Sequence, residues 1–279
     1  MMHAPGLAEL AKWIGGIAPA RTIPRFAGQS FTHWFRHRKA RRPAGRRVVL
    51  WPDTFNNYFR PRTAVAALHA LEQAGFHVVI PERPLCCGRP LYDWGMLDAA
   101  KRLWRQTIAT LRTDIEMATP IVGLEPACVS AFKDELPGLF PDDETALRLA
   151  EQTMFFSDFL DRYASGASLP RLDRRAVVQF HCHHHAVIKT DGAQHLLHRL
   201  GLDYEVLPSG CCGMAGSFGF EAGKYDMSIA AAERVLLPKI RATPEDTLVL
   251  ANGFSCREQI EQCTERRTLH VAEAVAGVG

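Results

Sequence analysis

The sequence repeats one order of apolar and amphipathic segments twice, and this repeat constrains the fold more than any other feature. Apolar runs typical of buried strands occur at 46–55, 77–82 and 119–128, and again at 174–182, 204–213 and 246–256. Segments with helical periodicity separate them, at 62–76, 95–112, 191–201 and 221–240, and a last helix begins near 257. This alternation predicts an α/β fold of two tandem βαβ-type repeats with mostly parallel sheets.

Cysteines gather at the ends of these strands. All of the eight cysteines except Cys263 lie at or just beyond a predicted strand, where the loops of parallel sheets bind ligands. In the second copy, 28 residues separate Cys182 from the adjacent pair Cys211 and Cys212, and 43 residues separate this pair from Cys256. Four thiolates from three loops suit zinc or an iron–sulfur cluster. The adjacent pair favours the cluster, because ligands of structural zinc usually lie ~2–4 residues apart.

Glycines and histidines accompany the cysteines of the second copy. Gly210, Gly213 and Gly216 allow unusual backbone dihedrals and let N–H groups approach anionic sulfur, so we predict that they contribute to cofactor binding. The stretch HCHHH begins with His181, and we expect His181 or His183 to lie beside the cofactor and tune its potential. Helix capping or surface placement is the alternative for these histidines. The pattern leaves any catalytic residue unassigned.

These stretches resemble the cysteine-rich CCG-domain proteins. That family includes heterodisulfide reductase B subunits, glycolate oxidase iron–sulfur subunits, lactate-utilisation iron–sulfur proteins and the C-terminal domains of FAD-linked D-2-hydroxyacid dehydrogenase fusions. The resemblance covers residues 46–279, and the stretch RTIPRFAGQSFTHWFR is similar to the linker of the FAD-linked fusions. It implies a [4Fe–4S] cluster, of cubane or non-cubane form, held by Cys182, Cys211, Cys212 and Cys256. Gly253 stands where some relatives have a further cysteine.

The first copy departs from the family pattern. Thr54 stands where relatives have the leading cysteine, which leaves the thiols of Cys86, Cys87 and Cys128. Asp53 and Glu125 lie in positions from which they could add oxygen ligands. Three soft ligands with hard neighbours leave an iron–sulfur cluster, a zinc ion or an empty site open.

The resemblance implies an electron-transfer module. It would receive electrons from an FAD-linked dehydrogenase that oxidises D-lactate, glycolate or 2-hydroxyglutarate, and pass them to an acceptor such as a quinone pool. No GxGxxG stretch follows a strand, so FAD is expected on a partner only. One alternative is a thiol or disulfide redox enzyme similar to the heterodisulfide reductase B subunits. The other is a structural subunit that binds zinc or no metal.

The pattern divides the chain into a basic N-terminal arm at 1–45, a first CCG domain at 46–140, a helical linker at 141–172 and a second CCG domain at 173–279. Residues 1–47 hold ten Lys and Arg against one acidic residue, Glu9, which suggests a solvated linker or a docking segment. Without a recognition motif, this charge does not predict nucleic-acid binding. The sequence shows no signal peptide or membrane-spanning run, so we expect a cytoplasmic protein that reaches the inner membrane face only through partners.

Overall fold

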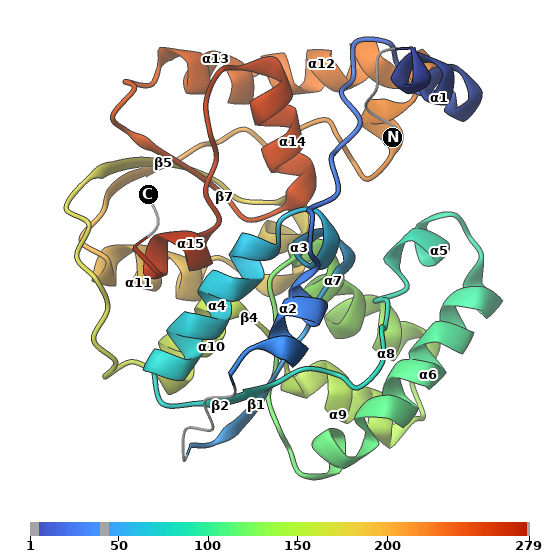
Figure 1. The fold of residues 1–279 in the computed structure, drawn as a ribbon, viewed down its shortest axis with the longest axis vertical. Helices are drawn as coiled ribbons and strands as arrows, with labels where there is room; N and C mark the ends of the chain where they lie inside the picture. The colour runs from blue at the N-terminus through green and yellow to red at the C-terminus, as the bar shows by residue number, and fades with distance from the viewer. Residues whose placement is uncertain (1–5, 40–44, 278–279) are drawn as a thin grey trace. The chain divides into compact units, whose positions relative to one another are not determined.

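The computed structural model describes residues 6–39 and 45–277, which form two compact units (Figure 1). The β1–β4 unit contains the described residues of 27–173, together with 183–202 and the chain from 271 on. The β5–β7 unit contains the described residues up to 26, together with 174–182 and 203–270. Each unit is therefore built from separate stretches of the chain, unlike the consecutive domains expected from the sequence. The basic stretch at 40–44 lies outside the described residues.

The β1–β4 unit is built on a parallel sheet with the strand order β2-β1-β3-β4. Its strands are β1 (Arg47–Leu50), β2 (His77–Val79), β3 (Ile121–Gly123) and β4 (Thr153–Phe155). β1 lies in the middle, with Val49 paired to Val79 on one side and to Ile121 on the other. The helices that follow these strands are α3 (Thr54–Tyr58), α4 (Pro61–Gln73), α5 (Arg89–Asp93), α6 (Leu97–Glu116), α7 (Pro126–Ser130), α8 (Leu136–Leu139), α9 (Glu144–Gln152) and α10 (Phe156–Tyr163).

Three further helices belong to this unit, namely α2 (Phe31–His37), α11 (Asp191–Arg199) and α15 (Val271–Val275). Two π-helical turns, η1 (Ala131–Glu135) and η2 (His184–Ile188), complete it. The helix α4 shows why the sequence folds in this way. Pro61 stands in its first turn, where a missing N–H costs nothing, and Ala64, Leu68 and Leu71 recur on the buried face.

The β5–β7 unit has a parallel sheet with the order β6-β5-β7, formed by β5 (Arg175–Gln179), β6 (Asp203–Val206) and β7 (Leu248–Ala251). The first strand of the repeat is again central, so both units place their strands in the order second, first, third. The predicted α/β fold with parallel sheets is thus confirmed. The helical elements of this unit are α1 (Leu7–Gly15), η3 (Phe218–Phe220), η4 (Ala222–Lys224), α12 (Tyr225–Glu233), α13 (Leu236–Ala242) and α14 (Phe254–Cys263).

Two sequence expectations differ from the structure. The segment 141–172, expected as a helical linker, contains α9, α10 and between them the strand β4, which pairs with β3 and adds a fourth strand to the sheet. The single helix expected at 221–240 is broken into α12 and α13. Pro238 explains the break, because its ring has no N–H and would clash with the carbonyl of Arg234 in a continuous helix.

No helix among the described residues has both the length and the apolar composition needed to cross a bilayer.

Candidate functional site

The four cysteines of the second copy come together in the β5–β7 unit. Cys182 follows β5, the pair Cys211 and Cys212 lies in the loop after β6, and Cys256 is in the first turn of α14, after β7. The thiol of Cys211 is hydrogen-bonded to those of Cys182 and Cys212. The thiol of Cys212 is also hydrogen-bonded to that of Cys256. The four sulfur atoms therefore form a continuous chain of contacts at the carboxyl ends of three adjacent strands.

This group of thiols has a buried side and an exposed side. Cys212 and Cys256 are buried in an apolar cluster with Leu207 and Met214. Cys182 and Cys211 are exposed. A group bound by all four sulfurs would therefore rest on the apolar core and present one edge to solvent or to a partner.

The neighbouring thiols change the acidity of one another. Hydrogen bonds from the Cys182 and Cys212 thiols hold the pKa of Cys211 far below its ordinary value. The N–H of Gly213 adds a further donor, 3.3 Å from the Cys211 sulfur. Hydrogen bonds with Cys211 and Cys256, together with burial, raise the pKa of Cys212. The surroundings of Cys211 therefore favour its thiolate, whereas those of Cys212 favour its protonated thiol.

Different structural constraints act at the three glycine positions of the cysteine loop. All three have left-handed backbones, with φ of 63° at Gly210, 85° at Gly213 and 65° at Gly216. A Cβ atom on Gly213 would lie 2.1 Å from the carbonyl oxygen of Ser228, whereas Gly210 and Gly216 have open space at that position. Gln179, which the sequence did not single out, fixes the start of the loop by donating from Nε2 to the Gly210 carbonyl, 3.1 Å away.

The imidazole of His181 lies among these cysteines. It is buried, and its Nδ1 lies 3.7 Å from the sulfur of Cys182. A Cβ atom on Gly253 would lie 2.4 Å from His181 Cδ2, so the ring fills the space beside this glycine. His183, the other histidine considered, also lies close: the ligand atoms of His181, Cys182 and His183 are all within 4.8 Å of one another, so these side chains could hold a metal ion.

The three cysteines of the first copy also meet, within the β1–β4 unit. Cys86 and Cys87 lie in the loop after β2, and Cys128 lies in α7, after β3. The Cys87 thiol is hydrogen-bonded to those of Cys128 and Cys86. The hydrogen bond with Cys87 lowers the pKa of Cys128, but burial and the charges of Asp53 and Glu125 outweigh this and raise the pKa to about 11.

The two carboxylates near Cys128 are helix caps. Asp53 accepts hydrogen bonds at Oδ1 from the N–H groups of Phe55 and Asn56, at 3.0 and 2.9 Å, and at Oδ2 from the Asn56 amide at 2.8 Å. Burial raises the pKa of Asp53. Glu125 caps α7 by accepting from the N–H of Ala127 at 3.3 Å. Both carboxylates thus have structural partners, and a role as metal ligands stays a prediction.

The two copies place equivalent residues in equivalent positions. Cys128 and Cys256 are each the third residue of the helix after the third strand, and the caps of those helices are Glu125 and Gly253. The glycine of the first Cys-Cys-Gly triplet, Gly88, has a φ of 77°, like its counterpart in the second triplet. Trp104 supports this loop, because its Nε1 donates to the carbonyl of Cys87 at 2.6 Å. The sequence gives no signal for that contact.

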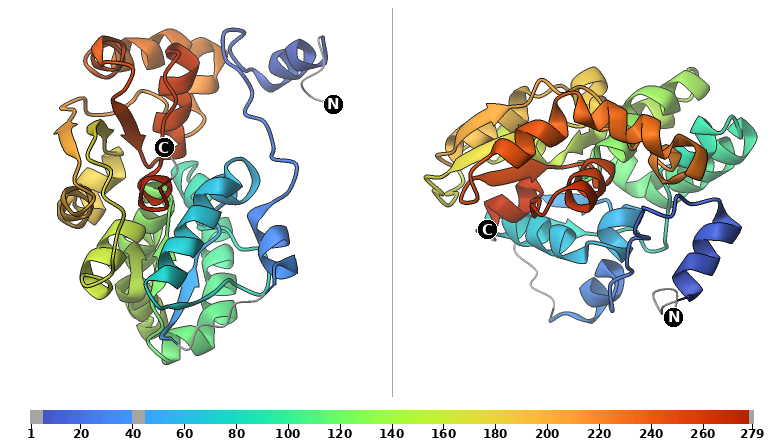
Figure 2. Two further views of the ribbon diagram at one scale, coloured as in Figure 1. Left: turned by 60° about the vertical axis from the view of Figure 1, so that its left-hand side comes forward. Right: turned by 90° about the horizontal axis from the view of Figure 1, so that it is seen from above.

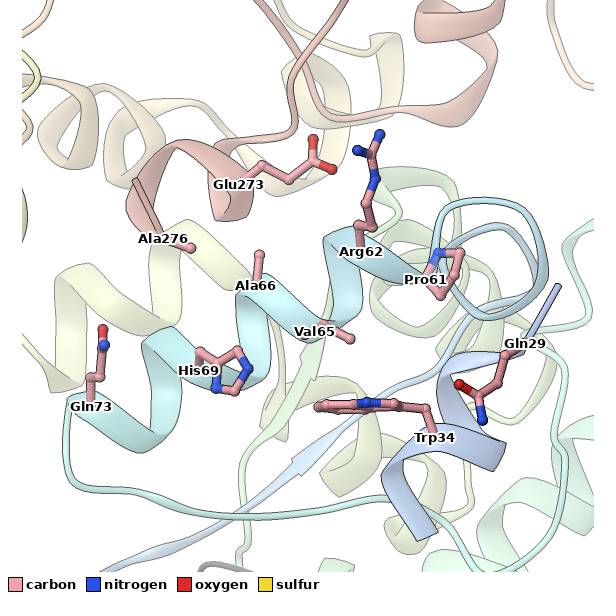
Figure 3. Close-up of a pocket in the computed structure, with 10 residues that line it drawn as sticks. All are labelled: Gln29, Trp34, Pro61, Arg62, Val65, Ala66, His69, Gln73, Glu273 and Ala276. Atoms are coloured by element: carbon pink, nitrogen blue, oxygen red, sulfur yellow. The ribbon is translucent and has the colours of Figure 1, made fainter. Parts of the chain in front are cut away.

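A pocket of about 480 Å³ lies in the β1–β4 unit, between α2, α4 and α15 (Figure 3). The indole of Trp34 meets the ring of His69 edge to face, with centroids 6.2 Å apart, and Arg62 and Glu273 lie at the other end. None of the described cysteines lines this pocket. It is therefore separate from the cysteine groups.

One part of the chain matches a known family. Residues 53–133 match the family model of the cysteine-rich CCG domain, and this stretch includes Cys86, Cys87 and Cys128. In this stretch the chain is similar to the cysteine-rich CCG domain, in agreement with the Cys-Cys-Gly pattern of the sequence.

Curated relatives extend over most of the chain. The C subunit of anaerobic glycerol-3-phosphate dehydrogenase from Escherichia coli K12 is 28% identical over 92% of this chain, which spans 66% of that protein. D-2-hydroxyglutarate dehydrogenase from Pseudomonas putida is 28% identical over 99% of this chain, which spans only 28% of it. Lactate utilization protein A from Bacillus licheniformis is 29% identical over 75% of this chain and 87% of its own length. The chain thus corresponds to only part of the dehydrogenases that it matches.

Proposed function

We propose that this chain is the iron–sulfur electron-transfer module of an FAD-linked dehydrogenase that oxidises a D-2-hydroxyacid. The observation that carries the proposal is the meeting of Cys182, Cys211, Cys212 and Cys256 at the ends of three adjacent strands. Four thiols from the loops of three strands are a donor set that suits an iron–sulfur cluster. When bound, such a cluster would supply one-electron transfer.

The surroundings of these thiols support that role. The Gly213 N–H donates to the Cys211 sulfur, and hydrogen bonds to ligand sulfurs help to set the potential of a cluster. His181 would act in the same region through its position beside Cys182. The exposed sulfurs of Cys182 and Cys211 would mark the edge through which electrons pass, while Cys212 and Cys256 hold the group against the core.

For the first copy we propose a second metal site on Cys86, Cys87 and Cys128. The three thiols are in contact and two of them are buried. Such a group suits a soft metal, either as a zinc ion or as the iron of a cluster. Because Asp53 and Glu125 already accept hydrogen bonds from their own helices, three sulfurs are the ligands that we assign.

The names of the relatives support the assignment of substrate and partner. One relative is a D-2-hydroxyglutarate dehydrogenase, and another is one component of a glycerol-3-phosphate dehydrogenase. We therefore propose that the hydroxyacid is oxidised on a flavin-bearing portion of the assembly and that this chain passes the electrons to an acceptor such as a quinone. All eight cysteines are free thiols, which favours a reducing compartment. We therefore propose that the chain acts in the cytoplasm. Where partners hold it, it would act at the inner face of the membrane.

Anaerobic preparation tests the proposal. We expect the purified chain to contain iron and sulfide, to absorb visible light and to give an electron paramagnetic resonance signal on reduction. Cys211→Ser and Cys212→Ser should each abolish the signal of the second-copy cluster, whereas Cys263→Ser, outside both groups, should retain it. Protein with no iron would refute the proposal, and zinc without iron would indicate a structural role. Reduction of disulfides by an artificial donor would indicate a thiol redox enzyme instead.

A further inference from the structure

The helix α1 turns its apolar side to solvent. Leu7 and Leu10 are each 50% exposed, Ile14 is 71% exposed and Trp13 is 80% exposed. In contrast, the side chain of Lys12 is only 12% exposed, and it donates to the carbonyl of Pro19 at 2.9 Å. This is the reverse of an ordinary surface helix, which buries its apolar side and exposes its charges. We call Leu7, Leu10, Trp13 and Ile14 the α1 stripe.

Backbone hydrogen bonds join the end of α1 to the segment that follows the cysteine loop. The N–H of Ala18 donates to the carbonyl of Phe220 at 2.7 Å, and the N–H of Ala222 donates to the carbonyl of Gly16 at 2.9 Å. Ile17 and Glu221 form an antiparallel bridge between these two contacts. Figure 2 shows α1, in dark blue, at the edge of this unit.

Arg21 fixes the same segment more deeply. This side chain is 1% exposed, and its Nε donates to the carbonyl of Gly219 at 2.6 Å. Its Nη2 donates to Ser228 Oγ at 3.0 Å, and its guanidinium lies 4.9 Å from the ring centre of Tyr225. Gly219 in turn donates from its N–H to the carbonyl of Met214, two residues after Cys212. The position of α1 is therefore tied to the loop that carries the cysteine pair.

We infer that the α1 stripe is the docking surface for the flavin-bearing portion of the dehydrogenase, on the same or a separate polypeptide. This inference rests on the proposed function. An electron donor must approach the exposed edge of the second-copy site, and the stripe lies on a helix tied to the loop that forms this edge. A group of large apolar side chains held in solvent marks an interaction surface, and tryptophan is a frequent energetic centre of such surfaces.

The relatives and the local charges favour the flavin-bearing portion of the dehydrogenase as the partner that binds the α1 stripe. The chain spans 28% of the D-2-hydroxyglutarate dehydrogenase of Pseudomonas putida and 22% of that of Escherichia coli, so in both the rest of the polypeptide is available to meet this surface. A lipid surface fits less well. Helices that lie on anionic membranes carry exposed cations beside their apolar side, whereas α1 turns Lys12 inward and exposes Glu9.

A photo-crosslinking amino acid tests the docking. It is placed at position 13 of the full chain in the native organism, and at the similarly exposed Trp94 as a control. We expect the position-13 variant to cross-link to a flavin-containing dehydrogenase, identified by mass spectrometry, and the control to give no such product. Cross-linking from position 13 to lipid, to a second copy of this chain or to no protein would overturn the inference.

Reduction kinetics give the second readout. The variant Trp13→Ser/Ile14→Ser should be reduced by the identified dehydrogenase and its hydroxyacid at least ~10-fold more slowly than the native chain, because the centre of the interface is lost. Reduction by dithionite, iron content and the resonance signal should stay unchanged, as should all properties of Trp94→Ser. An unchanged rate in the double variant would refute the docking site alone, whereas a native chain without iron would refute the proposed function.

Discussion

The close contact at Gly213 allows a quantitative prediction. In Gly213→Ala, the new Cβ would lie 2.1 Å from the carbonyl oxygen of Ser228, and the backbone would keep a φ of 85°. The left-handed conformation costs an alanine about 1 kcal/mol relative to glycine. The overlap with a backbone atom adds the cost of overpacking, about 1–3 kcal/mol. The free energy of unfolding should therefore fall by about 2–4 kcal/mol.

Gly216→Ala is the matched control from the same loop. Its φ of 65° carries a similar strain, but the space around its Cβ is open, so only about 1 kcal/mol should be lost. Urea unfolding followed by circular dichroism measures both variants, and hydrogen exchange at residues 210–220 locates the change. We also expect iron content to fall in Gly213→Ala and to be retained in Gly216→Ala. If both variants lose the same free energy of unfolding, backbone strain alone, and not the contact with Ser228, explains why glycine is needed at position 213.

Three further predictions concern single side chains. Cys256→Ser should remove iron from the second-copy site while leaving any metal on the first copy, and metal analysis that shows no loss would contradict the ligand assignment. Burial raises the pKa of Asp158 from 3.8 to about 7, so folding favours its protonated form; stability should fall as the pH rises from about 4 to 7, by up to roughly 4 kcal/mol. Asp158→Asn should flatten this dependence in urea unfolding, and an unchanged pH profile would refute the assignment. Arg21→Met should cost about 3–5 kcal/mol because buried acceptors lose their donor, and a thermal midpoint equal to that of the native chain would count against this.

The strands and the cysteine positions could be predicted from the sequence because their signals are local. Runs such as the residues of β1 and β7 are apolar, short and bounded by turn residues, and the Cys-Cys-Gly triplets occur at matching places in each repeat. Parallel βαβ units bring the ends of such strands to one edge, so the meeting of the cysteines follows from topology.

The elements that were missed depend on contacts between distant residues. β4 has only three residues between two helices, and its pairing with β3 decides its conformation against a helical pattern. An arginine is rarely buried without partners, and those of Arg21 are Gly219 and Ser228, 198 and 207 residues later, so the sequence alone suggested an exposed arm. The capping role of Asp53 did have a signal, since an aspartate directly before a helix is a common N-cap.

The two units also have a consequence for how the protein is made. Residues 183–202 and the helix α15 pack with the first sheet, while 203–270 pack with the second. No single cut in the polypeptide can release either half intact, and expression of one half alone would omit parts of its core. On the ribosome, the β1–β4 unit must wait for α15 to emerge before α4 receives its neighbour, so this unit matures only after the whole of the other has been synthesised.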